Sequence, residues 1–386
     1  MKEVIQRSKY RVYLNKSQES IFADTVGCAR FVWNKRVENF NNNSCEKDLS
    51  IKELKEVYPF LEKVPYNALE QVLQNWNQTK KQFFSKIRKV KLGRPKFKSK
   101  KSGCQSFRVT YNGFSLKKGY LYVSKFGKIN VKGLEEILTL SKITSITFIR
   151  KPTGKYYISV VHSAYKKEKV KTGKVVGIDL GLTHFMIDDK GGKIENPRFY
   201  RKSEAKLKVL QRAFSRKKKG SKRYLKCKKK VAVLHEKISN QRNNFLHESA
   251  NHLINNYDKI YVEDLSVKNM VRNRRMAKSI SDASWSRFVS ILTYKAEWYG
   301  KSVYKINRWF ASSKTCSECG YQLDKLDLSI REWTCFDCDV RHDRDVNAAK
   351  NVLKRGIFEE AKMGICKTYL KKSDAESWND VVIPTH

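Results

Sequence analysis

The sequence predicts a multidomain α/β protein that also contains a small β-barrel, and three features support this prediction. The length of 386 residues leaves room for two or three domains. Apolar runs that end in a carboxylate indicate buried strands of an α/β sheet, whereas a stretch of short alternating runs is typical of a small antiparallel barrel or sandwich. Hydrophobic residues make up 40% of the chain and aromatic residues 12%, which argues against wholesale disorder.

The charge balance predicts an anionic partner. Lys and Arg number 81 against 38 Asp and Glu, a formal net charge of +43. A compact globule with this excess would repel itself unless a polyanion bound to it. No run approaches the roughly 18 apolar residues of a membrane span, and the N-terminus lacks the apolar run of a secretory signal. We therefore expect an intracellular, cytoplasmic protein with no membrane partner.

The N-terminal part combines strand and helix signals. The first dozen residues have a strand pattern, and apolar residues then recur at helical spacing from Ser17 to about Ser85. From about Gln105 to Ala164, short alternating runs and turn residues predict the small barrel or sandwich. If its first strand is the one at residues 8–14, the helical region is an insertion into the barrel.

Two blocks of the chain are strongly basic. Residues 80–101 carry eleven Lys or Arg and no acid, and Gly93-Arg94-Pro95 interrupts any helix there. In residues 201–230, fifteen of thirty are Lys or Arg, and the interspersed apolar residues predict a helical hairpin with one apolar stripe. Either block could be a solvated charged face, but repulsion among like charges favours phosphate binding. Residues 355–386 carry five basic and five acidic side chains, and we expect a loosely ordered tail there.

Acidic residues lie at the ends of three predicted elements. Asp179 ends the run Val175–Asp179, Glu263 ends a second short apolar run, and Asp343 and Asp345 precede a strongly helical segment. Taken singly, each acid could be a helix cap or a strand-flanking residue. Together, at adjacent strand ends of an α/β sheet, such acids repel one another unless divalent cations neutralise them. Mg²⁺ or Mn²⁺ suits oxygen ligands, so the cluster points to two-metal phosphodiester hydrolysis.

Four of the nine cysteines form two CxxC pairs with fifteen residues between them: Cys316, Cys319, Cys335 and Cys338. This spacing predicts a zinc ribbon, in which four thiolates fill the tetrahedral positions and leave none for water. We therefore predict one structural Zn²⁺. Because the quartet lies between the second and third acids, the ribbon must be inserted within the catalytic domain.

Several motifs of the chain resemble those of the TnpB family. They are GIDLG around Asp179, YVEDL around Glu263, TCSECG through CFDC at 315–338, and HDRDVNAAKN around Asp345. TnpB proteins are RNA-guided nucleases encoded by insertion sequences and regarded as ancestors of the type V CRISPR effectors. The similarity runs from VGCARFVWNK at 26–35 to about Lys354, with the acids and the ribbon in the family's order.

The resemblance implies a RuvC-like RNase H fold, a guide RNA made from the transposon end, and cleavage of double-stranded DNA beside a short adjacent motif. It makes Asp179, Glu263 and Asp345 the catalytic triad that holds two Mg²⁺ or Mn²⁺. Asp345 is chosen over Asp343 because the matching family position lies two residues before the Asn of the NAA run. With no second nuclease domain visible, one site must cut both strands in turn. The resemblance also implies a bacterial or archaeal cytoplasmic protein, associated with the nucleoid when on DNA.

The domains that the resemblance implies are a wedge-like β-barrel at 1–15 and 102–170, a helical recognition insertion with a basic linker at 16–101, a RuvC-like nuclease at 171–311 and 341–354, the zinc ribbon at 312–340 and a C-terminal tail at 355–386. The nucleic-acid contacts that we expect are Lys80, Lys81, Arg88, Arg94, Lys96, Arg216, Lys217, Lys218, Lys222, Arg223, Arg274 and Arg275. Candidates for reading the adjacent motif are Asn75, Trp76, Gln78 and Lys81.

Two other functions remain open from the sequence. A nuclease-idle protein could use guide RNA only to occupy DNA, although all three acids are present. A DDE-type transposase also clusters three acids on an RNase H fold, but such enzymes lack a ribbon before the last acid together with the HDRDxNAA signature. Whether one or two protomers assemble per RNA is undecided.

Overall fold

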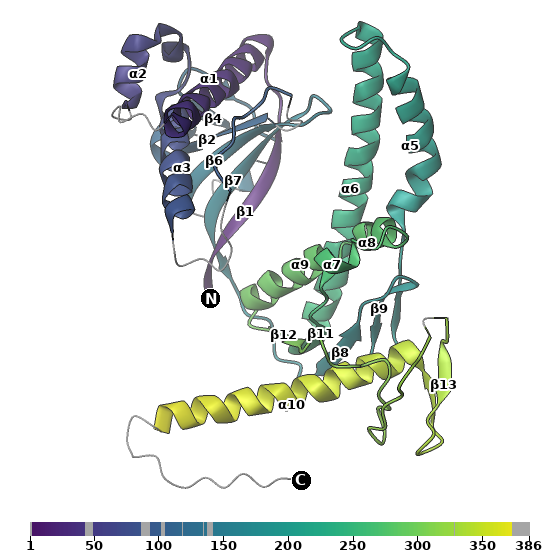
Figure 1. The fold of residues 1–386 in the computed structure, drawn as a ribbon. Coiled ribbons are helices and arrows are strands. Elements are labelled where there is room, and N and C mark those ends of the chain that lie inside the picture. Colours follow the sequence, from purple (N-terminus) through teal and green to yellow (C-terminus); the bar gives the residue numbers. More distant parts are fainter. Residues whose placement is uncertain are drawn as a thin grey trace. The chain divides into compact units, whose positions relative to one another are not determined.

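The computed structural model describes residues 2–42, 49–85, 93–101, 105–117, 119–133, 135–136, 142–327 and 329–372. The chain divides into two compact units, residues 1–166 with 217–233 and residues 167–216 with 234–386. Figure 1 gives the order of the elements along the chain. No helix in the described ranges is long and apolar enough to cross a membrane.

Two antiparallel sheets form the strand part of the first unit. The larger has the order β1 (Lys2–Val12), β7 (Tyr156–Lys166), β6 (Ile143–Arg150) and β2 (Gln105–Thr110). The smaller has the order β3 (Phe114–Lys117), β4 (Tyr120–Val123) and β5 (Gly127–Ile129). Both contribute to one core, in which Phe107 stacks on Phe148 with ring centroids 5.0 Å apart. A bridge from Val12 to Val131 links β1 to the segment after β5. The antiparallel strands agree with our prediction, while closure into a barrel stays a prediction.

The predicted strand over the first dozen residues is confirmed by β1. The narrower range 8–14 begins and ends too late, because β1 pairs with β7 along its whole length, from Lys2 opposite Lys166 to Val12 opposite Tyr156. Only the partner strand defines where β1 begins.

The predicted helical region contains α1 (Lys16–Asn41), α2 (Ile51–Val57), the 3₁₀ turn η1 (Pro59–Lys63) and α3 (Tyr66–Phe84). A capping box starts α1. The Asn15 side chain accepts a hydrogen bond from the Gln18 backbone N–H at 2.8 Å, and the Gln18 side chain accepts one from the Asn15 backbone N–H at 3.1 Å. Trp33 and Trp76 pack edge to face in the core of these helices, with centroids 5.6 Å apart. Trp76 is only 1% exposed, so our suggestion that it reads DNA was wrong. Its apolar bulk serves the helix core.

The second unit is built on a five-stranded mixed sheet. Its order is β10 (Lys193–Glu195), β9 (His184–Asp188), β8 (Val175–Asp179), β11 (Lys259–Glu263) and β12 (Ser302–Ile306). The central strand β11 runs parallel to both β8 and β12, whereas β8 and β9 form the predicted antiparallel hairpin. Parallel strands are usually covered on both faces, which explains the nearly continuous apolar runs of β8 and β11.

Helices cover the two faces of this sheet. On one face, Ile178 and Val262 pack with residues of α6 (Lys222–Asn256) and α9 (Trp285–Trp298). On the other lies α10 (Arg344–Lys372), which Figure 1 shows running along β8 and β11. The approach is close. A Cβ added at Gly177 of β8 would lie 2.4 Å from the Ala349 carbonyl oxygen, and one at Gly356 of α10 would lie 2.2 Å from the Tyr261 ring.

The course of α10 corrects our view of the C-terminal segment. We expected a loosely ordered tail from residue 355, but the helix continues to Lys372. Glu360 accepts hydrogen bonds from Lys259 at 2.8 Å and from the Tyr304 hydroxyl at 2.9 Å, so the segment is anchored on the sheet. Balanced charge in the sequence says nothing about such packing. Residues 373–386 lie outside the described residues.

The second basic block forms the predicted helical hairpin, made of α5 (Phe199–Ser215) and α6. Leu207 is buried, in agreement with an apolar stripe, but Leu225 is 56% exposed and does not belong to it. Two short helices, α7 (Val267–Met270) and α8 (Ala277–Ala283), connect β11 to α9.

The close approach at Gly177 leads to a stability prediction. Gly177→Ala should lower the free energy of unfolding by about 1–3 kcal/mol, because its Cβ meets the backbone of α10 and the helix must shift. Thermal or urea unfolding measures this loss. Gly27→Ala is the matched control, since a Cβ at this position has its nearest neighbour at 4.0 Å. Gly27 lies inside α1, where alanine favours the helix more than glycine does. Equal effects of the two substitutions would show that α10 is not held against β8.

Candidate functional site

Two of the three predicted acids end neighbouring parallel strands. Asp179 is the last residue of β8 and Glu263 the last of β11. Successive side chains of a strand point to opposite faces. Because Gly177 and Tyr261 contact α10, Asp179 and Glu263, each two residues further on, lie on that same face. The parallel pairing and the alternation together place both carboxylates beside the helix.

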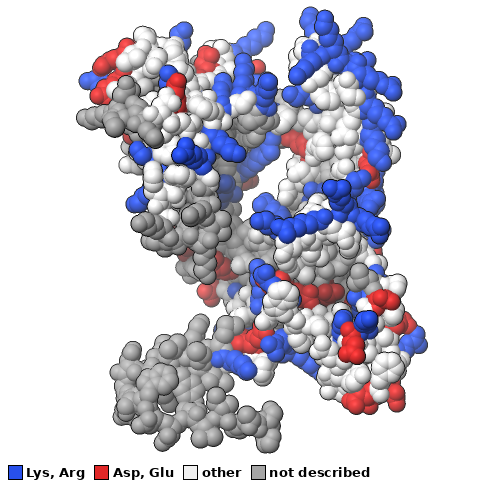
Figure 2. All heavy atoms as spheres, viewed as in Figure 1, with Lys and Arg blue, Asp and Glu red and all other residues white. Residues whose placement is uncertain are grey.

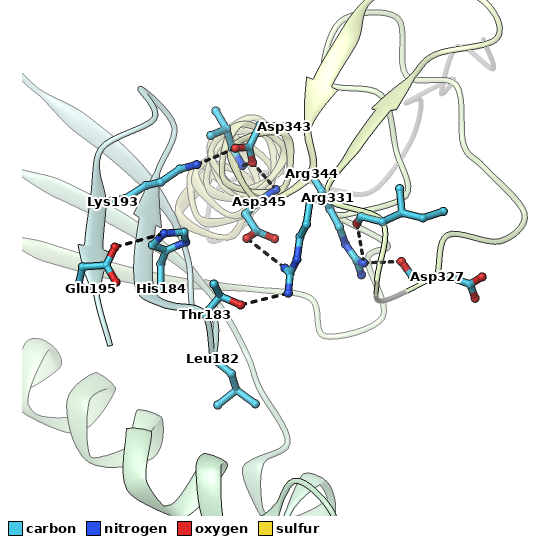
Figure 3. Close-up of polar contacts among 12 residues, drawn as sticks. Leu182, Thr183, His184, Lys193, Glu195, Asp327, Arg331, Asp343, Arg344 and Asp345 are labelled. Carbon is cyan, nitrogen blue, oxygen red and sulfur yellow. Dashed lines mark hydrogen bonds and ion pairs between the residues drawn. The ribbon is translucent and has the colours of Figure 1, made fainter. Parts of the chain in front are cut away.

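The third acid, Asp345, lies in the first turn of α10. Its neighbour Asp343 has a different task. The Asp343 carboxylate accepts from the backbone N–H groups of Asp345 at 3.0 Å and Val346 at 3.1 Å, and from Lys193 at 2.7 Å. Asp343 therefore caps the helix, as Figure 3 shows, while the Asp345 side chain projects separately. The choice of Asp345 as the third catalytic acid stays a prediction.

The charges of Glu263 and Asp345 act on the Asp179 carboxylate. Burial raises the pKa of Asp179 to about 8, and the charges of Glu263 and Asp345 add to the rise, against the Leu180 backbone N–H and the Arg344 guanidinium. Burial also raises the pKa of Glu263, although the Ser312 hydroxyl donates to its carboxylate. Acids from three separate elements thus meet in one place, where each disfavours ionisation of Asp179.

Sequence reasoning missed several side chains that contact these acids. The guanidinium of Arg331 lies 3.4 Å from an Asp345 carboxylate oxygen and 3.1 Å from the Thr183 hydroxyl, so it joins the ribbon segment to the loop after β8 (Figure 3). Ser312 bonds to Glu263. The sequence spacing of Arg331, Thr183 and Ser312 does not relate them to the acids. They come together with the acids only in the folded chain.

The four predicted cysteines come together as one cluster. Their Sγ atoms all lie within 4.8 Å of one another, with Cys316 to Cys338 at 3.7 Å and Cys319 to Cys335 at 3.6 Å. Tetrahedral Zn–S bonds of about 2.3 Å place sulfurs roughly 3.8 Å apart, so the spacing fits Zn²⁺. Among the described residues, no other three or more Cys, His, Asp or Glu ligand atoms approach one another this closely. The three acids are thus grouped more loosely than the cysteines.

The cysteine cluster is attached firmly to α10. Around it, β13 (Glu332–Thr334) pairs with β14 (Arg341–Asp343), and Trp333 is buried. Two asparagines of the HDRDVNAAKN motif bond to the ribbon backbone. Asn347 bonds to the Thr315 carbonyl at 2.7 Å and to the Ser317 N–H at 2.9 Å, and Asn351 bonds to the Ser312 carbonyl at 2.8 Å. These bonds fix the helix that carries Asp345 to the metal module.

The predicted nucleic-acid contacts lie mostly at the surface. Figure 2 shows Lys and Arg gathered along the α5–α6 hairpin. Arg88 lies outside the described residues, and the remaining predicted contacts are exposed: Lys80, Lys81, Arg94, Lys96, Arg216, Lys217, Lys218, Lys222, Arg223, Arg274 and Arg275. Of the other motif-reading candidates, Asn75 and Gln78 are exposed.

Comparisons with known proteins identify the family. A "Putative RNA-guided DNA endonuclease" from Streptomyces pristinaespiralis is 34% identical over 373 residues, covering 94% of this chain and 92% of that protein. The chain belongs to the TnpB family. InsQ of Escherichia coli (strain K12), which bears the same description, is 27% identical over 381 residues and covers 91% of this chain and 92% of its own.

Three family models match parts of this TnpB-family chain. A "Probable transposase" model of the OrfB/IS605 type covers residues 156–274, a Cas12f1-like TNB domain covers 285–352, and a helix-turn-helix model covers 1–41. The TNB match contains both the cysteine cluster and Asp345. Residues 2–41 form one strand and one helix, β1 and α1, so the helix-turn-helix description does not fit the structure.

A solved structure shares the fold. The Cas12f1 chain in a cryo-EM structure of a Cas12f1–sgRNA–target DNA complex matches with a TM-score of 0.52 at 13% identity. The match covers 91% of this chain and 98% of Cas12f1. At this identity the likeness establishes the mixed α/β fold alone.

The cysteine geometry predicts the effect of losing one ligand. Cys335→Ser should remove the bound zinc and unfold the ribbon locally, because structural zinc in such modules supplies on the order of 10 kcal/mol of folding free energy. Elemental analysis and limited proteolysis within residues 312–340 measure the two effects. Cys227→Ser, a substitution of a free cysteine on α6, should keep one zinc per chain. Retention of zinc by Cys335→Ser would exclude this cluster as the site.

The raised pKa of Asp179 predicts a pH-dependent gain from its removal. The folded chain holds a proton that the unfolded chain, with an ordinary pKa of 3.8, releases, so Asp179 costs stability increasingly as pH rises from about 4 to about 8. In buffer with EDTA, Asp179→Asn should therefore raise the melting temperature most at about pH 8–9 and least near pH 4. Mg²⁺ should raise the melting temperature of the parent more than that of the variant.

The control is Asp324→Asn, which neutralises an exposed carboxylate of the same unit and should give no such pH-dependent gain. If Asp179→Asn behaves like Asp324→Asn across this pH range, the pKa of Asp179 is not raised in the folded chain.

Proposed function

We propose that the chain is an RNA-guided DNA endonuclease of an insertion sequence, which cuts double-stranded DNA beside a short adjacent motif at a single RuvC-like site. The observation that carries the proposal is the meeting of Asp179, Glu263 and Asp345, with the pKa of Asp179 raised by burial and by the other two charges. The relatives that span almost the whole chain are named as RNA-guided DNA endonucleases, which supports the same activity here.

The three acids fit two divalent cations. Glu263 and Asp345 raise the pKa of Asp179, and a bound cation would stabilise the charged form of this carboxylate. Carboxylate oxygens are also the ligands that Mg²⁺ and Mn²⁺ prefer. Asp179, Glu263 and Asp345 would hold the ions, which when bound supply activation of the attacking water and stabilisation of the leaving 3′ oxygen.

Other residues of the chain keep the acids in position. Ser312 donates to Glu263 and so holds one oxygen of that carboxylate in place. Asp343 caps α10 and thereby sets the direction in which its first turn presents Asp345. The Asn347 and Asn351 bonds to the ribbon keep the helix start from moving relative to β8 and β11. The zinc ribbon thus acts on catalysis through position, without a water of its own.

The proposed partners are guide RNA and target DNA. The exposed cations of the α5–α6 hairpin would bind backbone phosphates, which requires charge and no base identity. The motif-reading residues are proposed among Asn75, Gln78 and Lys81, since an exposed amide can bond to adenine edges. The proposed domain limits are those implied by the resemblance, with α10 extending the nuclease part to Lys372.

The first test is cleavage by the purified ribonucleoprotein, whose guide is identified by sequencing the RNA that copurifies. With matched linear duplex and Mg²⁺, the parent should cut. Asp179→Ala should abolish cutting and leave guided DNA binding within about threefold, since the substitution removes a metal ligand without changing the basic surface. Asp324→Asn is the control and should cut normally. Binding without cutting by the parent would instead favour a nuclease-idle DNA-binding protein.

The basic hairpin gives a separate prediction. Replacing Lys217, Lys218, Lys222 and Lys229 with Gln should flatten the dependence of RNA affinity on salt, by roughly one unit of logarithmic slope for each phosphate that a lysine no longer neutralises. Titrations of RNA at several salt concentrations measure the slope. Four exposed lysines elsewhere, Lys16, Lys52, Lys63 and Lys325, form the matched Gln control. An equal slope in both variants would assign the hairpin charges to a solvated face.

A further inference from the structure

A tryptophan in the segment between β12 and Cys316 is exposed to solvent. Trp309 is 87% exposed, whereas Trp33, Trp76, Trp285 and Trp333 are each at most 8% exposed. An indole so exposed gains nothing from burial in the folded chain. Its indole is therefore available to a molecule that binds this loop.

The loop turns Trp309 outward while anchoring its neighbours. The Asn307 side chain accepts from the Trp309 backbone N–H at 2.9 Å, and the Asn307 carbonyl accepts from the Phe310 N–H at 3.2 Å. Phe310 packs against the cluster of Tyr261, Ile306 and Val352 under α10. With Phe310 directed inward and the turn closed by Asn307, the Trp309 side chain is left at the surface of a fixed loop.

Both ends of this loop are bonded to the end of β11, where Glu263 lies. Arg308 pairs with Asp264, the residue after Glu263, and Ser312 donates to Glu263 itself. A cavity of about 280 Å³ is lined by both Glu263 and Trp309, together with Asn269, Asn307 and others. The indole thus borders the space in front of one of the proposed metal-binding acids.

We propose that Trp309 stacks on an unpaired base of the DNA strand beside the phosphodiester bond being cut, an inference that rests on the proposed function. Lys305, Arg308 and Trp309 line an adjoining hollow of about 620 Å³ together with Asp264 and Glu359. Both cations pair with Asp264, so they would bind a backbone phosphate in place of that carboxylate. Every base has a π face, and stacking on an aromatic side chain tolerates any sequence. That tolerance suits an enzyme whose target is chosen by a guide.

Stacking makes a quantitative prediction for cleavage. In single-turnover cleavage by the guide-loaded protein, Trp309→Ala should be about 10- to 100-fold slower than the parent, and Trp309→Phe within about threefold of it, since phenylalanine keeps a stacking face. Tyr111→Ala, which removes an exposed aromatic side chain of the first unit, should cut normally. A slow alanine variant alone could reflect a disturbed loop, so a substrate change is needed as well.

Abasic substrates separate stacking from loop damage. Duplexes with one abasic nucleotide at each position around the cut should include one that slows the parent as much as Trp309→Ala does. That same substrate should not slow Trp309→Ala further, because residue and base form one interaction. Independent, additive losses at every position, or normal cutting by Trp309→Ala, would overturn the proposal and leave Trp309 to a protein partner.

Fluorescence supplies a readout that does not depend on cutting. Trp378 lies outside the described residues, and its emission would add to that of Trp309. The chain carrying Trp378→Phe therefore serves as the parent in this experiment. In EDTA, matched target DNA should quench the emission of its guide-loaded complex, and Trp309→Phe should remove most of that quenching. If matched DNA quenches the parent but is never cut, the nuclease proposal fails, and only the contact of Trp309 with a DNA base is retained. If it cuts and Trp309→Phe changes neither quenching nor the abasic profile, the stacking proposal fails alone.

Discussion

The contact between α10 and the mixed sheet is the constraint on which the second unit depends. A helix can approach parallel strands this closely only where side chains are missing, and Gly177 and Gly356 supply the space, one from each side. The contact has a consequence far along the chain. Asp345 is separated from Asp179 by more than 160 residues, yet the helix start comes beside the end of β8 because the body of the helix is seated on that strand. Glu360, bonded to Lys259 and Tyr304, secures the other half of the helix.

Hydrogen bonds join the ribbon to α10, the helix that packs on the sheet. Asn347 and Asn351 bond to the backbone just before and within the first CxxC pair, and Asp343 ends the ribbon strand β14 while capping α10. The metal module therefore determines how the chain enters the helix. A structural zinc site with no catalytic water can in this way be necessary for a distant reaction.

The charges of the chain are distributed according to two opposite needs. Carboxylates are gathered where β8, β11 and α10 meet, at a cost that the raised pKa of Asp179 records. Cations instead line the outside of the α5–α6 hairpin, where they are hydrated. A polyanion brought in by the cations would be repelled by the acids unless divalent ions accompanied it.

The sequence by itself determined the features that depend on short spacings. The CxxC pairs predicted the thiolate cluster, apolar runs ending in Asp179 and Glu263 predicted buried strands, and the HDRD segment predicted a helix start, because each signal lies within a few residues. Long-range packing was not determined in this way. The strand limits of β1 depend on β7, the order of α10 beyond residue 355 depends on Tyr261 and Tyr304, and the burial of Trp76 depends on Trp33. Arg331, Ser312 and Trp309 reach the acids only through such packing. Local composition cannot specify which distant residues will share a surface, and only the tertiary structure decided that.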